Sequence, residues 1–113
     1  MAPERRRMDQ DDRRIFQRFS IRLPLRFIDL YSGKEGLGET QDVNAKGVGF
    51  KTGRELKVNT PVELWLDVPD RGEPLYTRGK ISWARPEGVG EFKVGVALEK
   101  ADLMGLSRIL RTI

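Results

Sequence analysis

Apolar and polar residues alternate strictly near the start of the chain, and this period of two predicts a β-strand over residues 18–27. The polar positions of this stretch, Arg22 and Arg26 among them, should form a solvent-exposed face. Pro24 argues against a helix there, although arginines recur at every fourth position. The apolar positions should face a core: Phe19, Ile21, Leu23, Leu25 and Phe27.

Five more short strands are predicted downstream, separated by turn sequences rather than by helices. A glycine-rich loop over residues 32–38 should lead into the second strand, and residues 44–47 should form a tight turn into the third. The aromatic residues Phe50, Trp83 and Phe92 fall on apolar parities and are assigned to the core. The further strands are predicted near residues 39–43, 48–50, 62–68, 75–84 and 92–98.

The chain should end in an amphipathic helix. Asp102 is a candidate N-cap, and the apolar residues after it recur at helical spacing: Leu103, Leu106, Leu110 and Ile113. This helix would cover an open side or end of the sheet structure. Six strands at short intervals with one terminal helix indicate an all-β fold, a small antiparallel barrel or sandwich.

Composition limits the chemistry that this chain can perform. Its 113 residues suit a single domain, and it contains no cysteine and no histidine. Disulfides, thiolate nucleophiles, the usual zinc sites and imidazole acid–base catalysis are therefore excluded. We expect a protein that is not an enzyme and has no catalytic cofactor or metal. No apolar run suits a signal peptide or a membrane span, so we expect a cytoplasmic protein without membrane insertion.

Positive charge is concentrated at the N-terminus. The chain carries a net charge of +4, and residues 1–26, with eight arginines and four acidic residues, account for all of it. The guanidinium group offers a planar fork of donors that matches phosphate oxygens or the O6/N7 edge of guanine. We predict a flexible basic arm over residues 1–12 and a single domain over residues 13–113.

Two short segments contain polar groups that a barrel does not need for folding. The first runs from Arg13 to Arg18, directly before the first strand, and the second is Asp42-Val-Asn44-Ala-Lys-Gly47 at the predicted turn. In this order they resemble the RxxxR and [D/N]xSxxG motifs of the PilZ domain family. With the strand pattern and the terminal helix, the resemblance spans approximately residues 11–110. It implies a six-stranded antiparallel PilZ-like β-barrel.

The resemblance also implies a ligand, because PilZ domains are receptors for cyclic di-GMP, a ring of two guanosines joined by two phosphates. Guanidinium forks would suit its phosphates or guanine O6/N7, and Asp42 could accept hydrogen bonds from guanine N1–H and N2–H₂. Asn44 replaces the serine of the motif, which would alter the binding geometry. An arginine at position 13 is associated in similar proteins with a stacked ligand pair. The candidate ligand-binding residues are Arg13, Arg14, Arg18, Asp42, Asn44 and Gly47.

The resemblance implies a cyclic di-GMP receptor or adaptor that regulates motility or biofilm formation. Its arginine-rich arm would close over the ligand and present a surface to a downstream protein partner. Trp65 and Tyr76 lie off the apolar parity and are candidates for such a surface. One alternative is a PilZ-like adaptor that works without ligand. Another is a basic-arm barrel that binds nucleic acid, which the lack of an aromatic stacking row disfavours.

Overall fold

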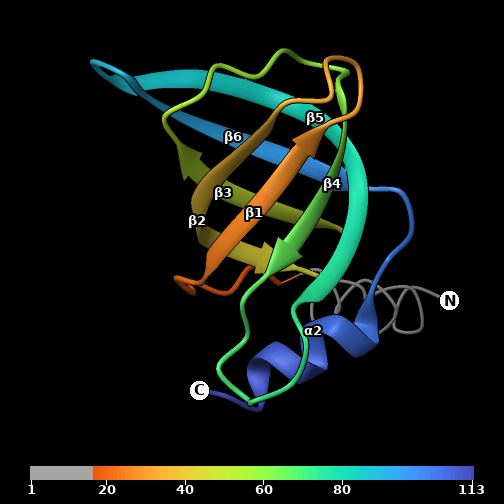
Figure 1. The fold of residues 1–113 in the computed structure, drawn as a ribbon. Coiled ribbons are helices and arrows are strands. Elements are labelled where there is room, and N and C mark those ends of the chain that lie inside the picture. The colour runs from red at the N-terminus through yellow and green to blue at the C-terminus, as the bar shows by residue number, and fades with distance from the viewer. Residues whose placement is uncertain (1–16) are drawn as a thin grey trace, which may run out of the picture.

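The computed structural model describes residues 17–113, which form a closed six-stranded antiparallel barrel and a short C-terminal helix (Figure 1). The order around the barrel is β1-β2-β3-β6-β5-β4. The predicted all-β class, barrel and terminal helix are confirmed. The predicted arm, residues 1–12, and the predicted domain start at residue 13 lie outside the described residues. The elements are β1 (Pro24–Asp29), β2 (Glu35–Asn44), β3 (Gly47–Thr52), β4 (Pro61–Leu66), β5 (Leu75–Gly88), β6 (Glu91–Leu98) and α2 (Leu103–Leu110).

The alternating apolar and polar residues of the strands face the inside and the outside of the barrel, respectively. In β4, for example, Val62, Leu64 and Leu66 are buried while Glu63 and Trp65 between them are only half-buried. Two aromatic rings, those of Phe27 and Phe50, meet in the centre with centroids 5.5 Å apart. Burying an apolar side chain of this size stabilises the fold by about 1.5–3 kcal/mol, so each of these rings contributes substantially to the stability of the barrel.

The first predicted strand is wrong in its first half, because β1 begins at Pro24. Before Pro24, the side chain of Thr40 in β2 hydrogen-bonds to the backbone in place of regular strand pairing. Its Oγ1 accepts from the Leu23 N–H at 2.8 Å and donates to the Ile21 carbonyl at 2.5 Å. Residues 17–23 therefore run beside β2 as an irregular segment, although their apolar side chains still pack on the core.

The predicted loop over residues 32–38 is also wrong, because β2 already begins at Glu35. Its glycines serve the packing. A Cβ atom at Gly36 would collide with the ring of Phe27, and one at Gly38 would lie 2.6 Å from the Lys51 carbonyl oxygen and 2.9 Å from the ring of Phe50. Glycine within a strand often marks such a close approach, so these residues make room for core aromatics instead of breaking the strand.

The β5–β6 hairpin is longer than predicted and extends past the barrel (Figure 1). Residues 86–88, predicted as a turn, belong to β5, and Pro86 pairs with Phe92. The chain reverses after Gly88, where Gly90 adopts a left-handed φ of 69° that suits glycine. Phe92 is half-buried, whereas Phe50 is fully buried as predicted.

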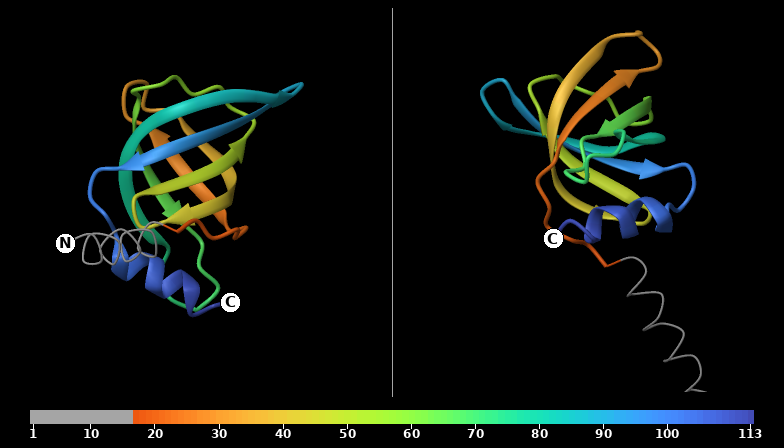
Figure 2. Two further views of the ribbon diagram at one scale, coloured as in Figure 1. Left: turned by 180° about the vertical axis from the view of Figure 1, so that it is seen from behind. Right: turned by 60° about the horizontal axis from the view of Figure 1, so that its bottom comes forward.

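Helix α2 closes one end of the barrel, as both views in Figure 2 show. Asp102 caps it as predicted, with Oδ1 accepting from the Gly105 N–H at 2.8 Å. Leu106 and Ile109 are buried against the barrel, whereas Leu103 and Ile113, predicted on the same stripe, are exposed. No helix within residues 17–113 has the length and apolar character that crossing a bilayer requires.

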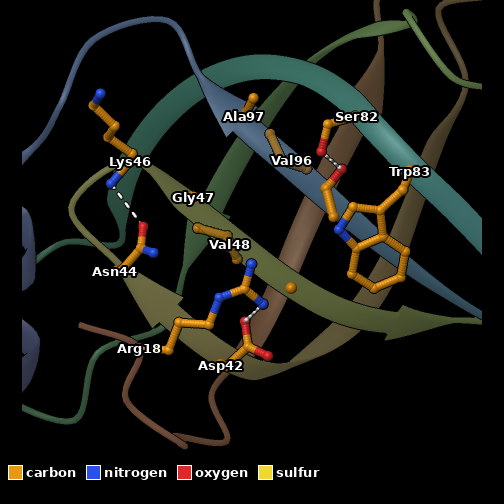
Figure 3. A pocket seen from close by; sticks show the side chains of 12 residues that line it. Arg18, Asp42, Asn44, Lys46, Gly47, Val48, Ser82, Trp83, Val96 and Ala97 are labelled. Carbon is orange, nitrogen blue, oxygen red and sulfur yellow. Dashed lines mark hydrogen bonds and ion pairs between the residues drawn. The ribbon is translucent and has the colours of Figure 1, made fainter. Parts of the chain in front are cut away.

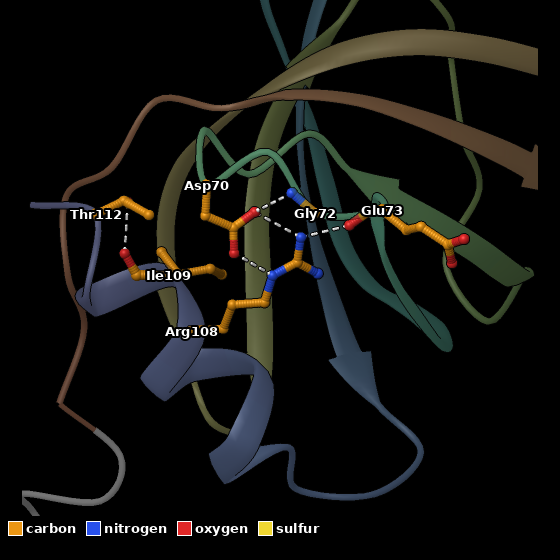
Figure 4. Close-up of polar contacts among 6 residues, drawn as sticks. All are labelled: Asp70, Gly72, Glu73, Arg108, Ile109 and Thr112. Atoms are coloured by element: carbon orange, nitrogen blue, oxygen red, sulfur yellow. Dashed lines mark hydrogen bonds and ion pairs between the residues drawn. The ribbon is translucent and has the colours of Figure 1, made fainter.

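One ion pair fastens α2 to the β4–β5 loop (Figure 4). Arg108 donates from Nε to Asp70 Oδ2 at 2.6 Å and from Nη2 to Asp70 Oδ1 at 2.8 Å. The same guanidinium also donates to the Glu73 carbonyl. Hydrogen bonding from Arg108 and from the Gly72 N–H holds the pKa of the Asp70 carboxyl well below its ordinary value.

Trp65 and Tyr76 lie on the outer face of β4 and β5, as their parity predicts. Their ring centroids are 5.5 Å apart, and the Arg26 guanidinium lies 4.2 Å from the centroid of the Trp65 ring. Trp65 is half-buried and Tyr76 is exposed. A role of this pair in partner binding stays a prediction.

Candidate functional site

An open hollow of about 190 Å³ lies on the outer face of β2, β3, β6 and β5 (Figure 3). Arg18 and Asp42 stand at one side of it, and Trp83 faces them from the other side. The hollow lies on the outside of the barrel and is open on one side. A flat ligand could therefore enter it from solvent.

One row of paired residues crosses the hollow over four strands, from one side to the other. Asp42 of β2 pairs with Gly49 of β3, Gly49 pairs with Gly95 of β6, and Gly95 pairs with Trp83 of β5. We call Gly49 and Gly95 the glycine floor. A Cβ atom at Gly49 would lie 2.8 Å from Asp42 Oδ1, and one at Gly95 would collide with the indole of Trp83. The carboxylate and the indole therefore lean inward over bare backbone.

Two β-bulges turn the side chains at both ends of this row outward. The register shifts between Thr40 and Asp42 in β2 and between Ile81 and Trp83 in β5. Thr40 and Ile81 are fully buried, so strict alternation would also direct the residues two positions later into the core. A bulge adds one residue to its strand and reverses that direction, as bulges beside functional sites often do.

The assignment of Trp83 to the core is therefore wrong. Trp83 shares a parity with Ile81, but the bulge at Ser82 brings it to the outer face, where it is half-buried. The Ser82 hydroxyl donates to the Gly95 carbonyl at 3.1 Å, which ties the bulge to the floor. The sequence offers one signal of this site: Gly49 and Gly95 occupy outward positions within strands, where glycine often marks a close approach.

Arg18 is held near Asp42 by the backbone. The Phe19 N–H donates to the Val43 carbonyl at 2.8 Å, and the Val43 N–H donates to the Phe19 carbonyl at 2.9 Å. Arg18 Nη1 lies 3.8 Å from Asp42 Oδ1, and the side chains are 65% and 25% exposed. An ion pair this long and exposed is worth about 0–1 kcal/mol. Both groups can therefore turn to a ligand at little cost.

The β2–β3 turn forms the third side of the hollow. Asn44 Oδ1 accepts from the Lys46 N–H at 2.8 Å, so the side chain stabilises the turn itself. A Cβ atom at Gly47 would lie 3.0 Å from the Val96 carbonyl oxygen, which explains glycine there by close packing of β3 on β6. The turn is fastened to α2, because the Asp102 N–H donates to the Ala45 carbonyl at 2.7 Å.

Four of the predicted site residues thus line one hollow: Arg18, Asp42, Asn44 and Gly47. Arg13 and Arg14 lie outside the described residues. The prediction missed Trp83 and the glycine floor. The arrangement combines a hydrogen-bond acceptor, a cationic donor and an aromatic face around a flat floor. Such a site suits a planar base with hydrogen-bond donors on its edge and an attached anion.

Comparison with known proteins gives a family. Residues 12–112 match the family model of the PilZ domain. Comparison with curated proteins gives no match. Two solved structures resemble the fold. The first is the inhibitor of motility MotI/DgrA of Bacillus subtilis, with a TM-score of 0.66 and 11% identity over 85% of this chain and 47% of that one. This chain therefore spans about half the length of that protein.

The second is the PilZ domain of CeSA from a cellulose-synthesizing bacterium, with a TM-score of 0.58 and 20% identity over 84% of this chain and 92% of that one. At these identities the two structures establish the fold alone. The family model covers nearly the whole chain, and it agrees with the observed barrel. This chain belongs to the PilZ domain family.

Proposed function

We propose that this chain is a receptor that binds cyclic di-GMP in the hollow between Asp42 and Trp83. PilZ domains are a family of cyclic di-GMP receptors. The observation that supports the proposal most is the row Asp42, Gly49, Gly95 and Trp83, which sets an acceptor and an indole on either side of the glycine floor. No other residue type than glycine would leave the floor this flat.

One guanine of the ligand would lie on this floor. Its N1–H and N2–H₂ would donate to the Asp42 carboxylate, and its ring would contact the indole of Trp83. Stacking of a base on an aromatic side chain contributes about 1–3 kcal/mol, and a charge-assisted hydrogen bond about 1.5–3 kcal/mol. Arg18 would exchange its weak contact with Asp42 for a phosphate oxygen.

The hollow is smaller than the roughly 300–1,000 Å³ of most pockets for small molecules. A cyclic dinucleotide would therefore project from it and need contacts on its outer side. We infer that Arg13 and Arg14 provide them, since they precede Arg18 directly and match the family motif. Ordering such a segment costs about 1–2 kcal/mol per residue, which a few hydrogen bonds to phosphate would offset.

We further infer that the output is a contact with a downstream protein. The family consists of regulatory receptors, and one structural neighbour is named an inhibitor of motility. Ligand binding would reach helix α2 through the turn at Asn44, because Ala45 accepts a hydrogen bond from the Asp102 N–H at the start of α2. A cytoplasmic location would fit this role.

A ligand-independent adaptor is the second candidate. The observation in its favour is that Asn44 Oδ1 is engaged with the Lys46 N–H instead of pointing to a free ligand position. In that case the surface around α2 and the β2–β3 turn would bind a partner in one fixed state.

Calorimetric titration of cyclic di-GMP separates the two candidates. The wild type should bind, and Asp42→Ala and Arg18→Ala should each weaken binding by about tenfold or more, because each removes a charge-assisted contact. Linear GMP dinucleotide serves as the ligand control. Glu55→Ala, an exposed acidic residue away from the hollow, serves as the variant control. Absence of binding by the wild type would favour the adaptor without ligand.

A further inference from the structure

A second row of side chains runs beside the glycine floor on the same outer face. Lys51 of β3 pairs with Lys93 of β6, and Lys93 pairs with Arg85 of β5. We call these three residues the basic row. Lys51 and Lys93 stand two positions from Gly49 and Gly95 along their strands, so the two rows are about 7 Å apart. The basic row therefore runs next to the glycine floor, just outside the residues that line the hollow.

This row is unfavourable for the fold by itself. Side chains directly opposite each other on neighbouring strands approach closely, and like charges in such pairs destabilise a sheet. Within residues 17–113, neither lysine forms an ion pair, and Arg85 has only a long contact of 3.6 Å to Glu87. Glu39 pairs with Lys51 in the register, but its side-chain oxygen contacts Gln41. An anion from outside would relieve the repulsion.

The basic row also reaches the wall of the hollow. The Arg85 guanidinium lies 5.4 Å from the centroid of the Trp83 ring. Arg18, in contrast, lies on the opposite side of the glycine floor. Its neighbour Phe19 pairs with Val43, which lies between Asp42 and the β2–β3 turn. Lys51 pairs with Glu39, which lies on the other side of Asp42 along β2. The glycine floor is thus bordered by cations on both sides, with the indole at one end.

We propose that the basic row is a phosphate site, which takes one phosphodiester of the cyclic dinucleotide while Arg18 takes the other. This inference rests on the proposed function and extends it. The two phosphodiesters of cyclic di-GMP lie on opposite sides of its macrocycle. This arrangement fits a floor that has cations on two sides. A guanine nucleotide with one phosphate would use only one of these sides.

Titration of cyclic di-GMP into the double variant Lys51→Gln/Lys93→Gln tests the proposal. Its affinity should fall about tenfold at low salt, and the loss should shrink as salt screens the charges. The matched control is Lys34→Gln/Lys57→Gln, which removes two exposed loop lysines and the same charge. The control should bind like the wild type. Guanosine, which has no phosphate, should bind both double variants equally.

The outcomes are distinguishable. If the wild type does not bind cyclic di-GMP, the proposed function and this inference both fail. If the wild type binds and the basic-row variant matches the control, only the inference fails. Without ligand, the Lys51→Gln/Lys93→Gln variant should have a melting temperature equal to or above that of the wild type, because it loses a like-charge pair. A clearly lower melting temperature would show that the lysines serve the fold and would overturn the assignment.

Discussion

The indole of Trp83 lies directly over Gly95, its partner across β5 and β6, and occupies the space that a side chain at that position would need. This contact places an aromatic wall on the outer surface of the barrel, where a ligand can reach it. The site therefore requires glycine at position 95. The core on the other side of the strand is formed by the neighbouring residues Val94 and Val96.

Replacing this glycine should therefore damage the site more than the fold. In Gly95→Ala, the new methyl group collides with the indole and displaces it, and cyclic di-GMP affinity should fall about tenfold. Calorimetry gives the affinity and circular dichroism the melting curve. Gly53→Ala is the matched control, because a Cβ there would meet only the Gly90 carbonyl at an ordinary 3.5 Å. Equal affinity of both variants would contradict the stacking role of Trp83.

The chain contains two tryptophans, so fluorescence can assign the contact. Trp65→Phe leaves Trp83 as the single reporter, and its emission should change on addition of cyclic di-GMP. Trp83→Phe leaves Trp65, which lies on β4 away from the hollow and should not respond. Trp83→Ala should lose about 1–3 kcal/mol of binding free energy, and Trp83→Phe less. A response from Trp65 alone would place the ligand elsewhere.

The bulge at Ser82 decides the direction of Trp83. Deletion of Ser82 would force either Trp83 into the filled core or Ile81 out of it, so we expect a loss of about 2–5 kcal/mol in the free energy of unfolding. Ser82→Ala removes only the hydrogen bond to the Gly95 carbonyl and should cost about 0.5–1.5 kcal/mol. Urea unfolding measures both values. A deletion variant as stable as Ser82→Ala would mean that the bulge is dispensable.

The ion pair between Asp70 and Arg108 should make stability depend on pH. The pKa of Asp70 is lower in the folded chain than in the unfolded chain, so folding gains stability above the unfolded pKa of about 3.9. This gain is lost as the pH falls toward the folded pKa. The melting temperature of the wild type should therefore fall more steeply below about pH 4 than that of Asp70→Asn.

Asp67→Asn is the control for this prediction, since Asp67 is an exposed carboxylate in the same loop region. Its melting temperature should follow that of the wild type across the whole pH range. Parallel curves for the wild type and Asp70→Asn would show that the contact of Asp70 with Arg108 contributes nothing to stability in solution.

The sequence by itself determined the all-β class, the approximate positions of the six strands and the terminal helix, and its two motifs indicated the family and thereby the barrel. Alternation such as that of residues 62–66 records which side chains meet the core, and Asp102 marks the start of α2 through its side-chain chemistry. The two motifs, in the order of the family, also predicted one ligand site from six residues. Of these, Arg13 and Arg14 lie outside the described residues, and the other four are Arg18, Asp42, Asn44 and Gly47. All four line the same hollow.

Only the tertiary structure decided the floor and the far wall of the site. Parity within a strand is local, whereas a bulge depends on how the neighbouring strand pairs, so the direction of Trp83 could not be obtained from its distance to Ile81. Glycine is equally ambiguous in a sequence: it can permit a turn, as at Gly90, or make room for a ring, as at Gly36 and Gly95. The side chain that fills the space comes from another strand, and folding alone brings the two together.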